Sequence, residues 1–112
     1  MLRISALTLA FFFAAISTAP ATPRCSEPYA PQVPNGRTAT LDELNAARRD
    51  ARAFIAASDV YQECLLESPT SPRREALLDA NQAQKERIGS AVNAAIAAFN
   101  ARHTEQAQLS SR

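Results

Sequence analysis

Two stretches of the chain place apolar or small residues at alternating spacings of three and four, the pattern of helices that bury one face against each other. In 41–67 the repeating positions are Leu44, Ala47, Ala51, Phe54, Ser58, Tyr61 and Leu65. In 72–102 they are Leu78, Asn81, Lys85, Ile88, Val92, Ala95, Phe99 and Arg102. The sequence therefore predicts two helices, each with one row of core-facing residues, here called its seam.

Local signals set the ends of the first helix. Thr40 and Glu43 form a capping box, in which each side chain can accept a hydrogen bond from the other residue's backbone N–H. Pro69 cannot continue a helix, so the helix is expected to stop before it. These signals predict a first helix over 41–67.

The second helix has an equally clear start. Ser71 is a good N-cap, and Pro72 suits the first helical position. We expect this helix to end near Arg102, within a hairpin that covers 40–104, and the polar tail 105–112 to fray.

The turn at Pro69 and Thr70 folds the chain into an antiparallel, coiled-coil-like hairpin. Every seam residue then meets a seam residue when the numbers of facing residues add up to 139. Ser58 faces Asn81 in this register, and a hydrogen bond between them would fix it. Lys85 faces Phe54, so its stem should cover the ring while its amine reaches water.

Residues 22–39 are rich in proline and cannot form a helix. Cysteine or proline recurs every third residue, at Cys25, Pro28, Pro31 and Pro34. A polyproline II strand has three residues per turn, so these side chains share one edge. We expect that edge to lie on a stripe of the first helix made of Ala46, Ala53, Ala57, Val60 and Cys64, with Tyr29 and Val33 placed to fill the groove between the helices.

The chain has two cysteines, Cys25 and Cys64, and we expect them to form a disulfide that staples the extended strand to the first helix. A bridge that closes about 40 residues stabilises a fold by about 4 kcal/mol in the chain-entropy model. Redox chemistry is disfavoured because no C-x-x-C pair is present. An intermolecular bridge stays open at this point.

The first residues have the pattern of a signal peptide. Arg3 precedes an uncharged run of 13 residues, 4–16, and small residues follow up to Ala21. A run this short is typical of a signal peptide, whereas a membrane span needs about 20 residues. We expect 1–21 to be removed, at Ala21 or nearby, which leaves one small periplasmic or secreted domain with no stable membrane insertion.

Composition and motifs argue against several functions. The full chain has 12 basic and 11 acidic residues, and loss of Arg3 makes them equal, so no charge surplus points to nucleic acid. His103 is the single histidine, and no zinc, phosphate-loop or hydrolase motif is present. We expect no catalytic residue, metal or cofactor, and thus a protein that is not an enzyme.

Several of these residues together resemble an uncharacterised group of small exported helical proteins from proteobacteria. The shared pattern is C-x-x-P-x-x-P-x-x-P-x-G, then A-T-x-x-E, then Y-x-x-C-L, and a second helix that ends near F-N. Here it consists of Cys25, Pro28, Pro31, Pro34, Gly36, Ala39, Thr40, Glu43, Tyr61, Cys64, Leu65, Phe99 and Asn100. The resemblance implies an envelope location and a helical fold, and it brings no known activity.

Two functions remain. The first is a structural or interaction module of the envelope, whose partner is a second copy or another envelope protein. A second apolar stripe on the 72–102 helix supports it, made of Leu77, Ala91, Ala94, Ala98 and Ala101, with Ile96 at its edge. The alternative is an inhibitor or modulator of an exported enzyme, which inserts the extended strand or the 68–72 tip into its target.

Overall fold

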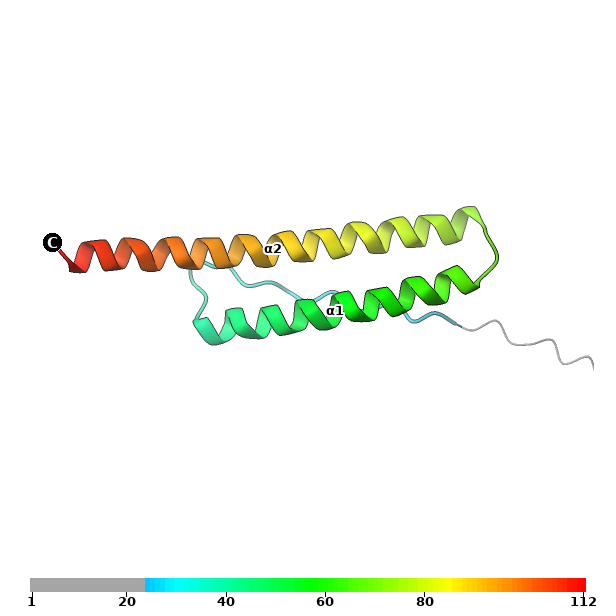
Figure 1. The fold of residues 1–112 in the computed structure, drawn as a ribbon, viewed down its shortest axis with the longest axis horizontal. Helices are drawn as coiled ribbons and strands as arrows, with labels where there is room; N and C mark the ends of the chain where they lie inside the picture. The colour runs from blue at the N-terminus through cyan, green and yellow to red at the C-terminus, as the bar shows by residue number, and fades with distance from the viewer. Residues whose placement is uncertain (1–23) are drawn as a thin grey trace, which may run out of the picture.

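The computed structural model describes residues 24–112, and the predicted signal peptide lies outside these residues. Two helices, α1 (Leu41–Glu67) and α2 (Pro72–Ser110), run antiparallel and pack side by side (Figure 1). The described part of the chain contains no β-strand. Residues 24–39, here called the proline segment, are extended up to Pro34 and form a turn at 36–38.

The first helix has the predicted limits and the predicted cap. Thr40 Oγ1 accepts the backbone N–H of Glu43 at 3.1 Å, and Glu43 Oε2 accepts the backbone N–H of Thr40 at 2.7 Å. Both contacts satisfy donors that the start of a helix leaves free. At the other end Ser68 is extended, which stops α1 at Glu67.

The tip between the helices is held by two contacts. Ser71 Oγ accepts the backbone N–H of Arg74 at 3.0 Å, which caps α2 as predicted. The Arg74 guanidinium donates to the carbonyl oxygen of Ser68 at 2.9 Å. The carbonyl end of α1 and the start of α2 are therefore tied together.

The second helix ends later in the chain than the sequence predicts. The helix continues to Ser110 rather than stopping near Arg102, so most of the tail expected to fray is helical. Glu, Gln, Ala and Leu fill this stretch, and no glycine or proline interrupts it, so propensity alone favours the helix. Because α2 has 39 residues and α1 has 27, α2 extends about 18 Å farther, past the start of α1 (Figure 1).

The two predicted seams form the core. All seven seam residues of α1 are buried, from Leu44 to Leu65. On α2, Asn81, Val92 and Ala95 are buried, and the other seam residues up to Arg102 are half-buried. The core is thus a single row along the contact between the helices.

A polar pair sits in the middle of this row. Ser58 is 0% exposed and Asn81 is 2% exposed. The Asn81 amide donates to Ser58 Oγ at 3.1 Å, and its oxygen accepts from Gln62 Nε2 at 2.8 Å. The predicted partners therefore meet, which confirms the register. The side chain of Lys85 extends out of the seam, and its amine forms a salt bridge with Asp59 Oδ1 at 2.6 Å.

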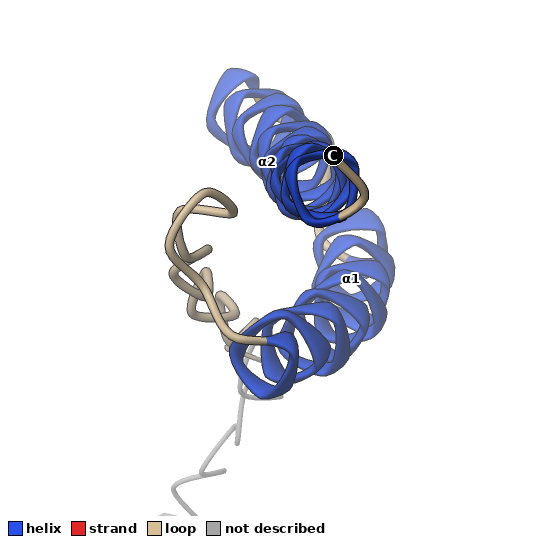
Figure 2. Ribbon diagram, turned by 90° about the vertical axis from the view of Figure 1, so that its left-hand side faces the viewer, coloured by secondary structure: helices blue, strands red, loops and turns tan. Residues whose placement is uncertain are grey.

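The proline segment forms a third layer beside the hairpin (Figure 2), but its path differs from the prediction. Ala53, Ala57 and Val60 of the expected stripe are exposed, Val60 to 66%. Val33 lies in the groove between the helices as expected, and it packs on a cluster formed by Ala39, Leu44 and Ala95, which come from both helices and the turn before α1. Tyr29 does not fill the groove, because its side chain is 90% exposed. A position over the groove lets Val33 bury apolar surface against two helices at once, whereas the alanine stripe offers only one.

We predict that Asn81→Ala lowers the free energy of unfolding by about 1–3 kcal/mol, because the buried Ser58 hydroxyl and Gln62 amide lose their partner. Urea denaturation followed by circular dichroism measures the change. The double variant Ser58→Ala with Asn81→Leu is the control, and it should recover most of the loss because neither buried polar group remains. Equal losses in both variants would contradict a role for the hydrogen bond.

Candidate functional site

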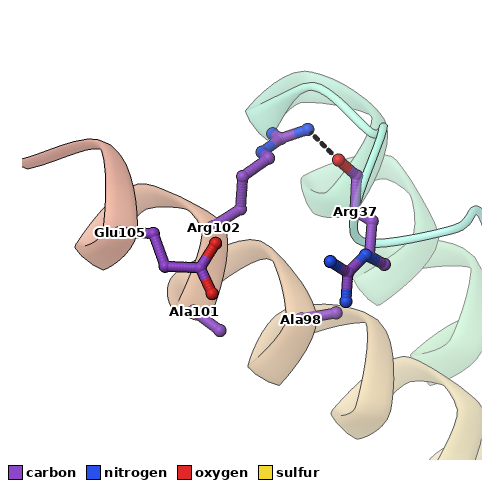
Figure 3. Close-up of a pocket in the computed structure, with 5 residues that line it drawn as sticks. All are labelled: Arg37, Ala98, Ala101, Arg102 and Glu105. Carbon is purple, nitrogen blue, oxygen red and sulfur yellow. Dashed lines mark hydrogen bonds between the residues drawn. The ribbon is translucent and has the colours of Figure 1, made fainter. Parts of the chain in front are cut away.

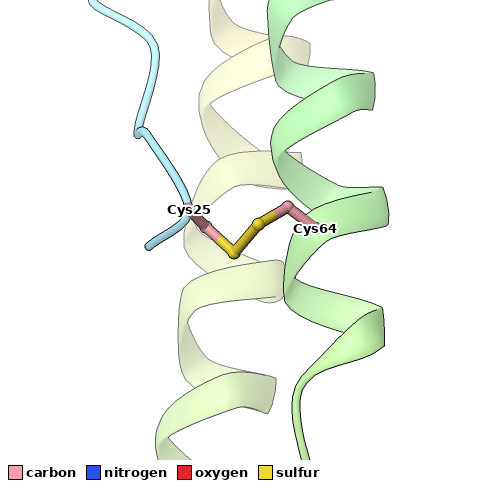
Figure 4. The surroundings of a disulfide bond; sticks show 2 residues. All are labelled: Cys25 and Cys64. Atoms are coloured by element: carbon pink, nitrogen blue, oxygen red, sulfur yellow. A yellow bond between two sulfur atoms is a disulfide. The ribbon is translucent and has the colours of Figure 1, made fainter. Parts of the chain in front are cut away.

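The proline segment is fixed at its first residues by a disulfide between Cys25 and Cys64, as predicted (Figure 4). The two Cα atoms are 5.6 Å apart, and the bridge spans 39 positions of sequence. Cys64 lies in the last turn of α1, so the bridge holds the segment near the tip of the hairpin. Both cysteines of the chain are used, and no thiol is free for exchange.

The other end of the proline segment is fixed by Arg102 of α2. Its guanidinium donates to the carbonyl oxygen of Arg37 and, at 2.8 Å, to that of Ala39 (Figure 3). The guanidinium carbon also lies 5.2 Å from the centre of the Phe99 ring, within range of a cation–π contact. One arginine therefore ties the chain that enters α1 to the far part of α2.

Gly36 brings the backbone of the segment against α2. A Cβ built on Gly36 would lie 1.9 Å from the carbonyl oxygen of Ala95, so only glycine fits there. Asn35 shapes the same turn, because its side chain accepts the backbone N–H of Arg37 at 2.9 Å. The segment is thus in direct backbone contact with α2 just before its Arg102 anchor.

The two anchors place the segment along one groove of the hairpin. Val33 and Pro34 line two surface hollows on this side, one together with residues of α2 and the other together with residues of α1. Part of the second apolar stripe predicted on α2 faces this groove. Leu77, Ala91 and Ala98 of that stripe are half-buried, and Ala94 and Ala101 stay exposed. The chain itself therefore covers much of the surface that the sequence suggested for a partner.

No segment of residues 24–112 lies over the opposite groove of the hairpin (Figure 2). On α1 the residues that share this face by helical spacing are Arg48, Arg52, Ile55, Asp59 and Gln62. On α2 they are Gln82, Glu86, Gly89, Asn93 and Ile96. We call these ten residues the open groove. Gln62 Nε2 lies 3.4 Å from Gln82 Oε1, which shows that the two sets border each other.

The packing of residues 24–112 does not require a glycine at position 89. A Cβ built at this position would meet nothing within 4 Å. Glycine inside a helix costs about 1 kcal/mol relative to alanine. The open groove therefore contains a glycine that the fold itself does not require, next to the half-buried Ile55 and Ile96.

Residues 24–112 contain no cluster of side chains that could hold a metal ion. No group of three His, Cys, Asp or Glu side chains comes together there. Burial, followed by the negative charge of Glu27, raises the pKa of the Tyr61 phenol, while Arg73 opposes this shift. Tyr61 is therefore neutral at ordinary pH and serves as a core residue. His103 is exposed, and its ring lies 4.2 Å from that of Phe99.

A surface hollow lies next to each of the two anchors of the proline segment. The hollow beside the Arg102 anchor has a volume of about 100 Å³, smaller than a typical ligand pocket (Figure 3). A larger one of about 580 Å³ lies by the disulfide. Its lining consists of Arg24, Cys25, Tyr61, Leu65, Ser68, Arg73 and Leu77. Neither hollow brings a nucleophile next to a general base.

The disulfide was predictable, whereas the Arg102 and Gly36 anchors were missed. The available signal was the position of Arg102, a seam residue that faces position 37 in the predicted register, before α1 begins at Leu41. Such a charge needs a polar partner, and the carbonyl groups before α1 were the nearest candidates. The contact of Gly36 with Ala95 could not be inferred without the path of the segment.

No family model, curated protein or solved structure matches the chain. The resemblance to small exported proteobacterial proteins thus rests on its residues alone. Within residues 24–112, neither helix has the length of apolar sequence needed to cross a membrane.

We predict that Arg102→Gln releases the end of the proline segment, because the charged donor to Arg37 and Ala39 is lost. The free energy of unfolding should fall by about 1–3 kcal/mol. Amide hydrogen exchange should speed up at 35–39, with little change in α1 beyond its first turn. Arg87→Gln, an exposed arginine on the same helix, is the control and should change neither quantity.

Removal of the staple should have a larger effect. We predict that Cys25→Ser with Cys64→Ser lowers the free energy of unfolding by about 4 kcal/mol, through the greater freedom of the unfolded chain. Urea denaturation of the oxidised protein and of the double variant measures this difference. A change below about 1 kcal/mol would contradict the disulfide as a main source of stability.

Proposed function

We propose that this chain is an exported protein-interaction module rather than an enzyme. The observation that carries the proposal is the difference between the two grooves of the hairpin. One groove is closed by the chain's own proline segment, whereas in the open groove no segment of residues 24–112 covers the half-buried Ile55, Gly89 and Ile96. A rigid scaffold with one uncovered helical face fits recognition of another protein.

Export is supported by the disulfide. Such bridges persist in oxidising compartments and are rare in reducing ones. The signal-like pattern of 1–21 and the resemblance to small proteobacterial envelope proteins point to the same location. We therefore place the mature chain in the periplasm or outside the cell.

The interaction is tested by photo-crosslinking in intact cells of the source organism. A photoreactive amino acid replaces Asn93, which is exposed in the open groove, or Arg87, which is exposed and six residues earlier on another face of α2. We expect crosslinked protein products from position 93 and few from position 87.

Two outcomes count against the proposal. Absence of protein crosslinks at both positions would contradict an interaction through the open groove. Recovery of the chain with free thiols and residues 1–21 still attached, shown by intact mass, would contradict export. The same mass measurement with and without reduction provides the control for the disulfide.

A second candidate is an inhibitor or modulator of an exported enzyme. Tyr29 favours it, because this aromatic side chain is 90% exposed between Pro28 and Pro31 on a segment fixed at both ends. Rigid exposed aromatic residues are common anchors in interfaces. In that case a photoreactive group at Tyr29 would capture the target, and position 93 would give no product.

A further inference from the structure

We propose that the hollow beside the disulfide binds a small organic anion with an apolar chain, namely an alkyl carboxylate. The hollow has a volume of about 580 Å³, which lies within the range of small-molecule sites. It is formed where the start of the proline segment meets the end of α1 and the start of α2. None of its residues belongs to the open groove, so this site goes beyond the protein-interaction role proposed above.

Two arginines line this hollow without an ionic partner. Arg24 and Arg73 are both exposed, and the ion pairs of residues 24–112 use other side chains. The neighbouring Arg74 is engaged differently, because it donates to Glu75 and to the carbonyl oxygen of Ser68. An arginine fork matches the two oxygens of a carboxylate, so Arg24 and Arg73 are suited to hold an anionic group there.

Tyr61 supplies a hydrogen-bond donor that the described part of the fold leaves unused. Tyr61 is 5% exposed and lines the hollow, yet its hydroxyl makes no hydrogen bond within residues 24–112. The charges of Glu27 and Arg73 both act on this phenol, which places its hydroxyl on the side of the hollow that Arg73 lines. Because burial, followed by Glu27, raises the pKa of Tyr61 against the opposing effect of Arg73, the phenol keeps its proton. It can therefore donate to an anion, and a buried polar group calls for such a partner.

The charges around the hollow favour a ligand with a single negative charge. Arg24 and Arg73 are basic, and Glu27 is the acidic residue that acts on the Tyr61 phenol. Together these three side chains leave one net positive charge beside the hollow. A carboxylate balances this charge, whereas a phosphate dianion would exceed it and would be repelled by Glu27.

An apolar surface continues from these polar groups. Leu65 is buried, Leu77 and Cys25 are half-buried, and all three line the hollow. The disulfide to Cys64 holds Cys25 in this position by a covalent bond (Figure 4). An alkyl chain would cover these apolar side chains while its carboxylate meets the arginines, which gives an amphiphilic anion an advantage over an inorganic one.

NMR titration of the oxidised, ¹⁵N-labelled mature chain, residues 22–112, with octanoate tests the proposal. Octanoate should bind saturably with a dissociation constant of about 1 mM or below. The largest amide shifts should occur at Tyr61, Leu65, Arg73 and Leu77. Acetate lacks the apolar chain and 1-octanol lacks the charge, so each should bind at least about tenfold more weakly than octanoate.

Two variants test the residues that would hold the carboxylate. Arg73→Gln removes one charge and Tyr61→Phe removes only the hydroxyl, and each should weaken octanoate binding by about tenfold. Arg87→Gln is the matched control, because Arg87 is an exposed arginine about four turns farther along the same helix. Its octanoate affinity should equal that of the wild type. The melting curves of both arginine variants should also match the wild type, so that a loss of affinity does not come from unfolding.

Several results would overturn the proposal. They are an absence of saturable octanoate binding at millimolar concentrations, acetate or 1-octanol binding as tightly as octanoate, or an Arg73→Gln variant with wild-type affinity. Shifts confined to Ile55, Gly89 and Ile96 would also contradict it, because they would place the ligand in the open groove.

Discussion

A hairpin of two helices has one seam and two flanking grooves, and it cannot bury both grooves by itself. In this chain a third piece without secondary structure closes one of them. The proline segment succeeds in this role because a covalent bond fixes one end and a charged side chain fixes the other. Between these anchors Val33 packs on the apolar cluster of Ala39, Leu44 and Ala95. The burial of the seam from that side depends on this attachment.

The buried polar pair serves a different purpose from the apolar seam. Alanine-rich helices can slide past each other, because one small residue packs much like the next. Ser58 and Asn81 remove this freedom, since any other register would bury an amide or a hydroxyl without a partner. Gln62 donates a hydrogen bond to the amide oxygen of Asn81, and it links this buried pair to the surface. Specific alignment thus comes from one layer of the core, and most of the apolar burial comes from the others.

Much of this fold could be read from the sequence, and the exceptions share a cause. The limits of α1, both seams, the register and the disulfide follow from local caps and from helical periodicity. The end of α2 was misjudged because polarity at 103–110 was given more weight than helix propensity. The expectation that Val33 enters the groove between the helices was right, but most of the expected alanine stripe is exposed, because a period of three defines an edge and not the surface beneath it. The contact of Gly36 with Ala95 joins residues 59 positions apart, which no local pattern contains.

The disulfide and the Arg102 contact differ in how much of the chain each one needs. Cys64 precedes the turn to α2, so every residue between the two cysteines belongs to the proline segment or to α1. When a chain crosses a membrane with its N-terminus first, both cysteines reach the oxidising side before α2 has crossed. The covalent closure therefore requires no finished hairpin. In the exported chain proposed above, Arg102 would cross later and complete an attachment whose other end the disulfide has already fixed.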